Sequence, residues 1–399
     1  MRLPGALLVT MLLVAGCDTL FTTAPDDADL LDAPVQGLTA AERAAFVRGD
    51  TEFGRAFTVG TGLGPIFNDV SCAACHSGDG RGRPENVLTR FSLDGDPYGA
   101  PGGPQLQTRA IPGAVAEVLP PGVQVSLRLP PPVFGVGLIE AIPEATILAL
   151  ADPMDADGDG ISGRAHFVTP PAYVPATEPG GGVGPRLGRF GRKAQVSTLL
   201  QQTVEAYLQD MGVTSDFLPE ENVNPQAPGT AESADRVGDP EIGASTVFAV
   251  VNYLRMLAPP APGADTPSRI HGRAVFESIG CASCHVPSLQ TGTSPIGALS
   301  NRAVALYSDL LLHDMGDDLA DNRPDGAADG REWRTTPLWG LRVMRGFLNG
   351  DVFLLHDGRA SSIAAAVELH GGEAAAVRAR WRALSAEDRA ALLDFVESR

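Results

Sequence analysis

Two stretches, Cys72-Ala73-Ala74-Cys75-His76 and Cys281-Ala282-Ser283-Cys284-His285, decide how this chain is expected to fold. Both have the form C-x-x-C-H, which is the attachment motif of c-type haem. The spacing lets two thiols bond to one porphyrin, and the following histidine then ligates the iron. The sequence therefore predicts two covalent haem c groups, attached at Cys72, Cys75, Cys281 and Cys284, with His76 and His285 as proximal iron ligands.

Other roles for these cysteines fit the sequence less well. A thioredoxin-like redox pair needs a βαβ context, which the surrounding sequence lacks. A zinc site needs four converging ligands, whereas each half of the chain carries a complete haem motif. A disulfide would need thiols to spare, and the only cysteine outside the two motifs is Cys17.

Cys17 belongs to an export signal. The amino terminus has Arg2 followed by an apolar run, Ala6–Ala15, which is too short to cross a bilayer as a mature helix. The stretch Leu13-Val14-Ala15-Gly16-Cys17 resembles a bacterial lipobox, in which the cysteine is lipidated. We expect a signal peptide over 1–17, a tether over 18–38, and an exported, periplasm-facing lipoprotein that contacts the membrane through this anchor alone. The alternative is a plain secretion signal with an incidental Cys17.

Composition and charge narrow the fold class and the partners. The 399 residues include 46 glycines and 33 prolines, which favours a mainly α fold with short helices and long loops. The formal net charge of −18 argues against binding nucleic acid, whose phosphates it would repel. An acidic surface could steer a basic electron-donor protein such as a lysine-rich cytochrome, or could simply keep the protein soluble.

The order of helix signals suggests two similar units. Thr39-Ala40-Ala41-Glu42 has the form of a capping box and predicts a helix towards Arg48. Helices are also expected at 245–257, around 272–276 before the second motif, and at 388–396 after the possible cap Ser385. We predict two cytochrome-c-like haem domains, 39–265 and 266–399, joined by the Pro-rich linker 258–267, with a large insertion at about 85–240 in the first.

The insertion contains a partial calcium-loop pattern. Asp155, Asp157 and Asp159 alternate along the chain, and Gly160 stands at the sixth position, where such loops turn sharply. The twelfth position, which normally supplies an acidic ligand, is His166. A bound Ca²⁺ and a plain acidic turn both remain open.

Several further motifs resemble one known family. They are Gly137-Leu138-Ile139-Glu140-Ala141-Ile142-Pro143, Leu312-His313-Asp314-Met315-Gly316, Thr335-Thr336-Pro337-Leu338-Trp339-Gly340, His356-Asp357-Gly358-Arg359 and His370-Gly371-Gly372-Glu373. With the two haem motifs, they resemble the bacterial di-haem oxidoreductase family of peroxidases over nearly the whole mature chain. The chain is also distantly similar to the di-haem cytochrome c peroxidases and to their relative that matures a tryptophylquinone cofactor.

The resemblance implies a sixth ligand for the second haem. In those relatives it lies fourteen residues past the His of a His-x-Gly element, and it is Met or Tyr. Counting fourteen residues from His356 reaches His370, which implies a bis-histidine haem, His285 with His370. Imidazole in place of thioether would lower the reduction potential. Met315 is the alternative ligand. It could instead be a methionine that only packs in the core.

The resemblance also implies different roles for the two haems. No sixth ligand is evident for the first haem, on His76, so hydrogen peroxide could reach its iron, with Glu140 or less plausibly Glu144 as the acid/base. Trp333 and Trp339 could bridge the haems or pack in the core, and His356 could contact a propionate or a loop. His166, His271 and His313 could be surface residues, and no role is assigned to them.

The expected function is therefore reduction of hydrogen peroxide, or of another small oxidant, with electrons from a cytochrome or similar donor. Two other functions stay open: a non-catalytic electron-transfer lipoprotein, in which both irons are six-coordinate, and an oxidase of a partner protein.

Overall fold

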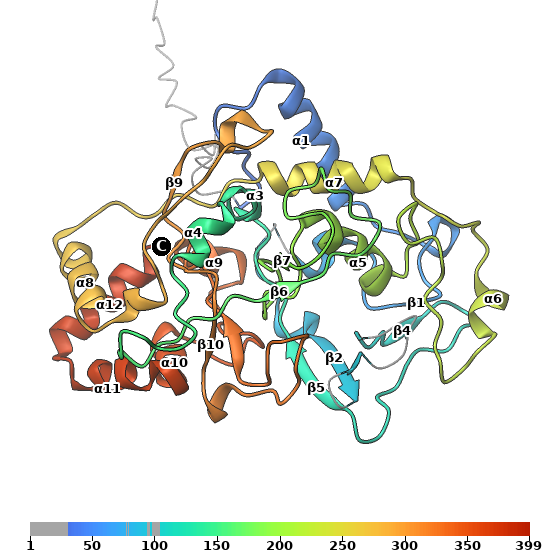
Figure 1. The fold of residues 1–399 in the computed structure, drawn as a ribbon. Helices are drawn as coiled ribbons and strands as arrows, with labels where there is room; N and C mark the ends of the chain where they lie inside the picture. Colours follow the sequence, from blue (N-terminus) through green and yellow to red (C-terminus); the bar gives the residue numbers. More distant parts are fainter. Residues whose placement is uncertain (1–30, 77, 79, 94–95, 98–103) are drawn as a thin grey trace, which may run out of the picture.

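The computed structural model describes residues 31–399, except residues 77, 79, 94–95 and 98–103. Within these residues the fold is mainly helical, as the composition predicts, and its strands are short (Figure 1). No helix in this part of the chain combines the length and the apolar character that crossing a bilayer requires. The export signal and Cys17 lie outside the described residues.

The first half is built on a close pair of helices, α1 (Ala40–Phe53) and α7 (Ala244–Met256). The capping box predicted for α1 forms: Thr39 Oγ1 accepts the Glu42 N–H at 3.2 Å, and the Glu42 carboxylate accepts the Thr39 N–H at 2.7 Å. These reciprocal bonds satisfy backbone donors at the helix start, where no helical partner exists.

A glycine sets the distance between these two helices. A Cβ atom placed on Gly49 would lie 2.2 Å from the Ala249 carbonyl oxygen, well inside van der Waals contact. Only glycine therefore allows α1 to approach α7 this closely.

The second half repeats this arrangement with α8 (Pro267–Ser278) and α12 (Ala386–Glu397), which lie side by side in Figure 1. Helix α12 begins after Ser385, whose side chain accepts the Asp388 N–H as predicted. A Cβ on Gly272 would lie 2.0 Å from the Ala391 carbonyl oxygen. Each half thus has one helix before its haem motif and one near its end, and the two cross at a glycine.

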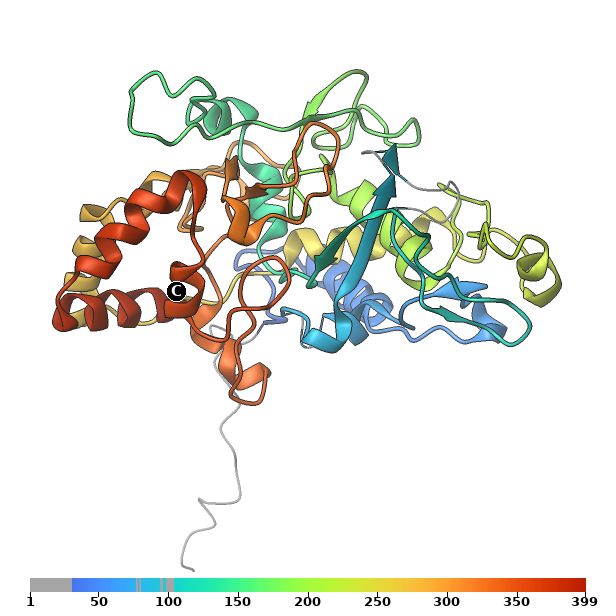
Figure 2. The same cartoon turned by 90° about the horizontal axis from the view of Figure 1, so that it is seen from below.

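The remaining elements surround these two pairs. Figure 2 shows the red helices near the carboxyl end and the gold α8 on one side of the molecule, whereas the blue and yellow-green helices of the first half lie towards the other. The other helices are α2 (Cys72–Cys75), α3 (Val136–Ala141), α4 (Glu144–Leu148), α5 (Leu199–Met211), α6 (Thr230–Ala234), α9 (Leu341–Phe347), α10 (Ile363–Glu368) and α11 (Ala375–Ala383).

The strands form short antiparallel sheets. The longest pairing joins β2 (Leu88–Leu93) to β5 (Gln124–Arg128), with Leu88 opposite Arg128, and β3 (Asp96–Pro97) adds to the other edge of β2. The two-stranded sheets are β1 (Ile66–Phe67) with β4 (Arg109–Ala110), β6 (Phe167–Val168) with β7 (Arg186–Leu187), β8 (Leu289–Gln290) with β9 (Ala303–Val304), and β10 (Leu312–Asp314) with β11 (Glu332–Arg334).

Different hydrophobic clusters surround the two helix pairs. The largest one gathers side chains of α1, α3, α5 and α7, including Phe46, Phe53 and Tyr253, with several residues from 289–311. A smaller one holds α8 and α12 together through Phe276, Phe395 and the side chains around them. The two C-x-x-C-H motifs border these different clusters.

Candidate haem-binding site

The second C-x-x-C-H motif follows directly on α8. Residues Cys281–Ser283 form a 3-10 turn, η5, and the His285 N–H donates to the Cys281 carbonyl at 3.0 Å. The imidazole Nδ1–H of His285 donates to the Tyr307 carbonyl oxygen at 2.9 Å, since a carbonyl can only accept. This bond leaves Nε2 with a lone pair, which is the form of imidazole that ligates iron.

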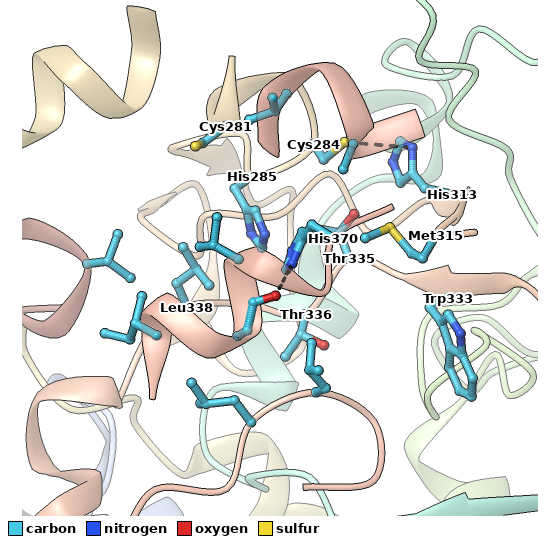
Figure 3. Close-up of a pocket in the computed structure, with 18 of the residues that line it drawn as sticks. Cys281, Cys284, His285, His313, Met315, Trp333, Thr335, Thr336, Leu338 and His370 are labelled. Atoms are coloured by element: carbon cyan, nitrogen blue, oxygen red, sulfur yellow. Dashed lines mark hydrogen bonds between the residues drawn. The ribbon is translucent and has the colours of Figure 1, made fainter. Parts of the chain in front are cut away.

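A cavity of about 210 Å³ lies beside this motif. Cys281, Cys284 and His285 line it, and His370, just beyond the end of α10, lines it too. Figure 3 shows the rings of His285 and His370 next to each other in this cavity. The Nδ1–H of His370 donates to the Ala366 carbonyl at 2.7 Å, so its Nε2 also keeps a lone pair. The fold thus brings together the two histidines of the expected bis-histidine pair.

Both imidazoles are uncharged at neutral pH. Burial lowers the pKa of His285 to about 4, and repulsion between a charged His285 and His370 contributes to the shift. Burial likewise lowers the pKa of His370. Met315, the alternative sixth ligand, lines the same cavity. Both candidates thus line the cavity that contains His285, and the choice of His370 over Met315 stays a prediction.

The rest of this cavity suits a haem group. Burial raises the pKa of the Cys281 thiol to about 12, so this sulfur is protonated at neutral pH. Most of the other lining side chains are apolar, among them Leu338, Leu341, Leu354, Ile363, Val367, Val377, Leu392 and Val396. A large apolar cavity with two thiols and two imidazole nitrogens at its edge fits a porphyrin that carries an iron.

The first motif forms the short helix α2. Ser71 caps it by accepting the Ala74 N–H at 3.1 Å, and the His76 N–H donates to the Cys72 carbonyl at 2.9 Å. Burial lowers the pKa of His76 to about 4, so this imidazole is neutral as well. No disulfide joins the four cysteines that the structure describes.

Glu140 lies outside the large cavity, on α3. Its side chain is 6% exposed, and Arg255 of α7 holds both carboxylate oxygens, with Nε–Oε2 at 2.6 Å and Nη2–Oε1 at 3.2 Å. The Leu199 N–H also donates to Oε1, at 3.3 Å. A proton-transfer role for Glu140 would therefore require its carboxylate to leave a buried ion pair. Glu144 lies in the first turn of α4.

Glu117 is a buried carboxylate that the sequence analysis did not single out. Its Oε2 accepts the Gln107 N–H at 2.7 Å, and no cation within the described residues lies within 4.0 Å of it. Burial raises the pKa of Glu117, although the bond from Gln107 partly opposes this. The Gln107 side chain in turn donates to the Ile66 carbonyl in β1, which leads into the first motif. No local pattern marks Glu117, because its burial depends on segments far away in the chain.

The predicted calcium loop folds into a tight turn. The carboxylates of Asp155 and Asp157 gather with that of Asp152, within 4.8 Å of one another, whereas Asp159 accepts the Ile161 N–H at 2.8 Å. His166, at the expected twelfth position, is buried, and its Nδ1–H donates to the Lys193 carbonyl at 2.7 Å. The acidic group that the structure assembles therefore includes Asp152 in place of Asp159.

The sequence left a surface position possible for His313. In the structure this residue is buried between two carboxylates. Its Nε2 lies 2.8 Å from Asp309 Oδ2, and its Nδ1 lies 2.7 Å from Glu373 Oε2. Although burial opposes it, these bonds raise the pKa of His313 well above 6.5. Glu373 also accepts hydrogen bonds from Ser162, beside the acidic loop. This network ties the acidic loop to the segment that follows His370.

The two tryptophans proposed as bridges occupy different places. Trp333 lines the cavity and stacks on His356, whereas Trp339 belongs to the large hydrophobic cluster. His271 is exposed and pairs with Asp388 at 2.8 Å. Core packing thus accounts for Trp339, and Trp333 is the one that reaches the haem cavity.

Comparison with known proteins places this chain in a family. The family described as "Di-haem oxidoreductase, putative peroxidase" matches residues 11–90 and 107–399. Hydrazine synthase of Kuenenia stuttgartiensis aligns with 99% of this chain and 100% of its own, at 13% identity and a TM-score of 0.38. A MauG-like protein associated with microbial copper homeostasis aligns with 67% of this chain and 87% of its own, at 15% identity and a TM-score of 0.31. No curated protein matches.

Proposed function

Because this chain belongs to the di-haem oxidoreductase family, we propose that it is an exported enzyme that reduces hydrogen peroxide with electrons from a donor protein. The observation that carries this proposal is the difference between the two haem motifs. His285 shares its cavity with two candidate sixth ligands, His370 and Met315. No such ligand is assigned to His76 among the described residues, so an iron held there would keep an open face.

The reaction needs two electrons and two protons for each peroxide, and it yields two water molecules. A haem iron, when bound, supplies the redox chemistry. His285 and His370 would hold the iron of the second haem, which would supply single-electron transfer from the donor. His76 would hold the iron of the first haem, which would supply the site for peroxide. The acidic surface, with a net charge of −18, favours a basic donor such as a cytochrome.

A side chain must also move a proton between the two peroxide oxygens. We propose Glu140 as this acid/base. Its carboxylate would have to leave Arg255 in order to reach the substrate. Glu117 is the comparison residue, because burial raises its pKa and so favours its protonated form.

The two haems would be covalently attached, at Cys72 and Cys75 and at Cys281 and Cys284, in two cytochrome-c-like domains, 39–265 and 266–399. The repeated helix pairs that cross at Gly49 and Gly272 support this division. Cys17 would carry the lipid that anchors the enzyme in a membrane, with the folded chain facing the periplasm. The insertion, about residues 85–240, would hold Ca²⁺ at Asp155 and Asp157, with Asp152 or Asp159 as a further ligand.

The test is steady-state oxidation of reduced cytochrome c by hydrogen peroxide, with the haem-loaded mature chain. Turnover, together with a high-spin signal from one haem only, would support the proposal. If the protein shows no turnover and both haems are low-spin in every redox state, it is an electron carrier. If reduced cytochrome c is not oxidised, but another protein is oxidised as peroxide is consumed, the chain is an oxidase of a partner protein.

A further inference from the structure

Three arginines from distant segments meet at the wall of the second-haem cavity. Arg81 follows the first C-x-x-C-H motif, Arg192 follows β7, and Arg334 ends β11, yet all three line the cavity that contains His285. Arg81 and Arg192 are 6% and 5% exposed. Three guanidinium groups therefore share a site that is largely removed from water.

Each of these arginines is anchored on a backbone carbonyl. Arg81 Nη1 donates to the Leu355 oxygen at 3.3 Å, Arg192 Nη2 to the Leu129 oxygen at 2.7 Å, and Arg334 Nε to the Gly191 oxygen at 3.1 Å. Each also keeps a buried nitrogen without a partner in the described chain: Arg81 Nε, Arg192 Nη1 and Arg334 Nη1. The carbonyls orient the guanidinium groups, but they leave some N–H donors without an acceptor and provide no negative charge.

Carboxylates that could neutralise this charge are engaged elsewhere. Asp357 pairs with Arg359 at 2.6 Å, and Asp309 pairs with His313 at 2.8 Å. Within the described residues, none of the three cavity arginines has a carboxylate oxygen within 4.0 Å. Burial lowers the pKa of Arg192, and the positive charges of Arg81 and Arg334 lower it further. Arginine nevertheless stays protonated in proteins, so the site lacks anions.

We propose that Arg81, Arg192 and Arg334 bind the propionate carboxylates of the haem attached at Cys281 and Cys284. Guanidinium groups bind carboxylates through paired N–H donors, and a buried charge is stable when it is paired in this way. A haem carries two propionates, which are the anions that a haem in this cavity would bring with it. This inference rests on the proposed attachment of the second haem.

The experiment uses the haem-loaded mature chain with the haem propionate carboxyls labelled with ¹³C. A haem count after alkaline pyridine treatment comes first, because fewer than two haems per chain would contradict the proposed function and not the role of the arginines. Redox-induced infrared difference spectra then follow the labelled carboxylate bands in the wild type, Arg192→Gln, Arg192→Lys and Arg334→Gln. Arg345→Gln is the control, since Arg345 is exposed, pairs with Glu397 and does not line the cavity.

If the arginines bind the propionates, the labelled carboxylate bands should shift in the cavity variants and not in the control. The reduction potential of the second haem should fall in Arg192→Gln and Arg334→Gln, because a lost cation disfavours the reduced iron, and Arg192→Lys should recover part of the change. Unshifted bands and potentials in a two-haem protein would overturn it. The wild type alone provides a second test: dependence of the second haem's potential on added phosphate would mean that the arginines bind a free anion instead.

Discussion

The imidazole of His356 stacks on the indole of Trp333, with ring centroids 3.7 Å apart and planes 7° apart. The Lys193 ammonium and the Arg128 guanidinium lie 4.4 and 5.1 Å from the same indole. Burial and the neighbouring arginines lower the pKa of His356 to about 3, although Asp357 opposes this, so the stacked ring is neutral. The indole therefore has a neutral ring stacked on it and two cations near it, in the wall of the haem cavity.

Replacement of Trp333 tests how far its indole N–H stabilises the site. Trp333→Phe removes the hydrogen bond from Nε1 to the Leu319 carbonyl, 2.9 Å long, and leaves that carbonyl unsatisfied. We expect the free energy of unfolding to fall by about 1–3 kcal/mol. Urea unfolding measures it, with the exposed Phe167→Leu as a control. An unchanged midpoint would mean that this hydrogen bond contributes nothing to stability.

His370 is expected to ligate the second iron. His370→Ala should convert the second haem from low-spin to high-spin, because an imidazole ligand of the iron is lost. Electron paramagnetic resonance of the oxidised protein measures the change. Met315→Leu is the matched comparison, since Met315 lines the same cavity. If Met315→Leu gives the high-spin signal and His370→Ala does not, the ligand is the thioether.

Glu140→Gln should affect stability as well as turnover. The substitution removes one of the two carboxylates that pair with Arg255, which keeps its contact with Glu178, and we expect a loss of about 1–3 kcal/mol. Thermal unfolding and peroxide turnover are measured together, with Glu117→Gln as the second variant. Lost turnover in a Glu140 variant that remains folded at the assay temperature supports the acid/base role. Normal turnover in that variant, with loss in Glu117→Gln, would move the role to Glu117.

The Glu373–His313 pair makes stability depend on pH in the acid range. Although burial opposes it, hydrogen bonds from His313 and Ser162 lower the pKa of Glu373 from 4.5 to about 2. Since the folded pKa lies below the unfolded one, the stabilisation is complete above about pH 4.5 and is lost as the pH falls towards 2. Glu373→Gln should therefore be less stable than the wild type at pH 6, with a difference that shrinks on acidification. A difference that grows below pH 4 would contradict this assignment.

Gly272→Ala should destabilise the second half. The added Cβ would lie 2.0 Å from the Ala391 carbonyl oxygen, so α8 must move away from α12, at a cost of about 1–3 kcal/mol. Gly346→Ala in α9 is the matched control, because nothing lies within 4 Å of its added Cβ and alanine favours a helix. Equal unfolding midpoints for the two variants would show that the two helices do not need the glycine.

Local features of the chain could be predicted without the fold. The capping box at Thr39 formed as expected, and so did the cap at Ser385, because the bonds involved join residues only three positions apart. The helix expected at 245–257 is α7, shifted by a single residue at each end. The apposition of His285 and His370 was accessible only through resemblance to a family, since no local pattern relates the two positions.

The remaining features depend on contacts between distant segments. Arg255 occupies both oxygens of Glu140, Asp309 and Glu373 enclose His313, and Arg81, Arg192 and Arg334 converge on one wall of the cavity. The two C-x-x-C-H motifs predict from the chain alone where two haems would attach, because that chemistry needs two thiols and an imidazole within five consecutive residues. Which charges are neutralised, and which still need a ligand, depends on the fold, because burial and pairing involve segments that are far apart in the chain.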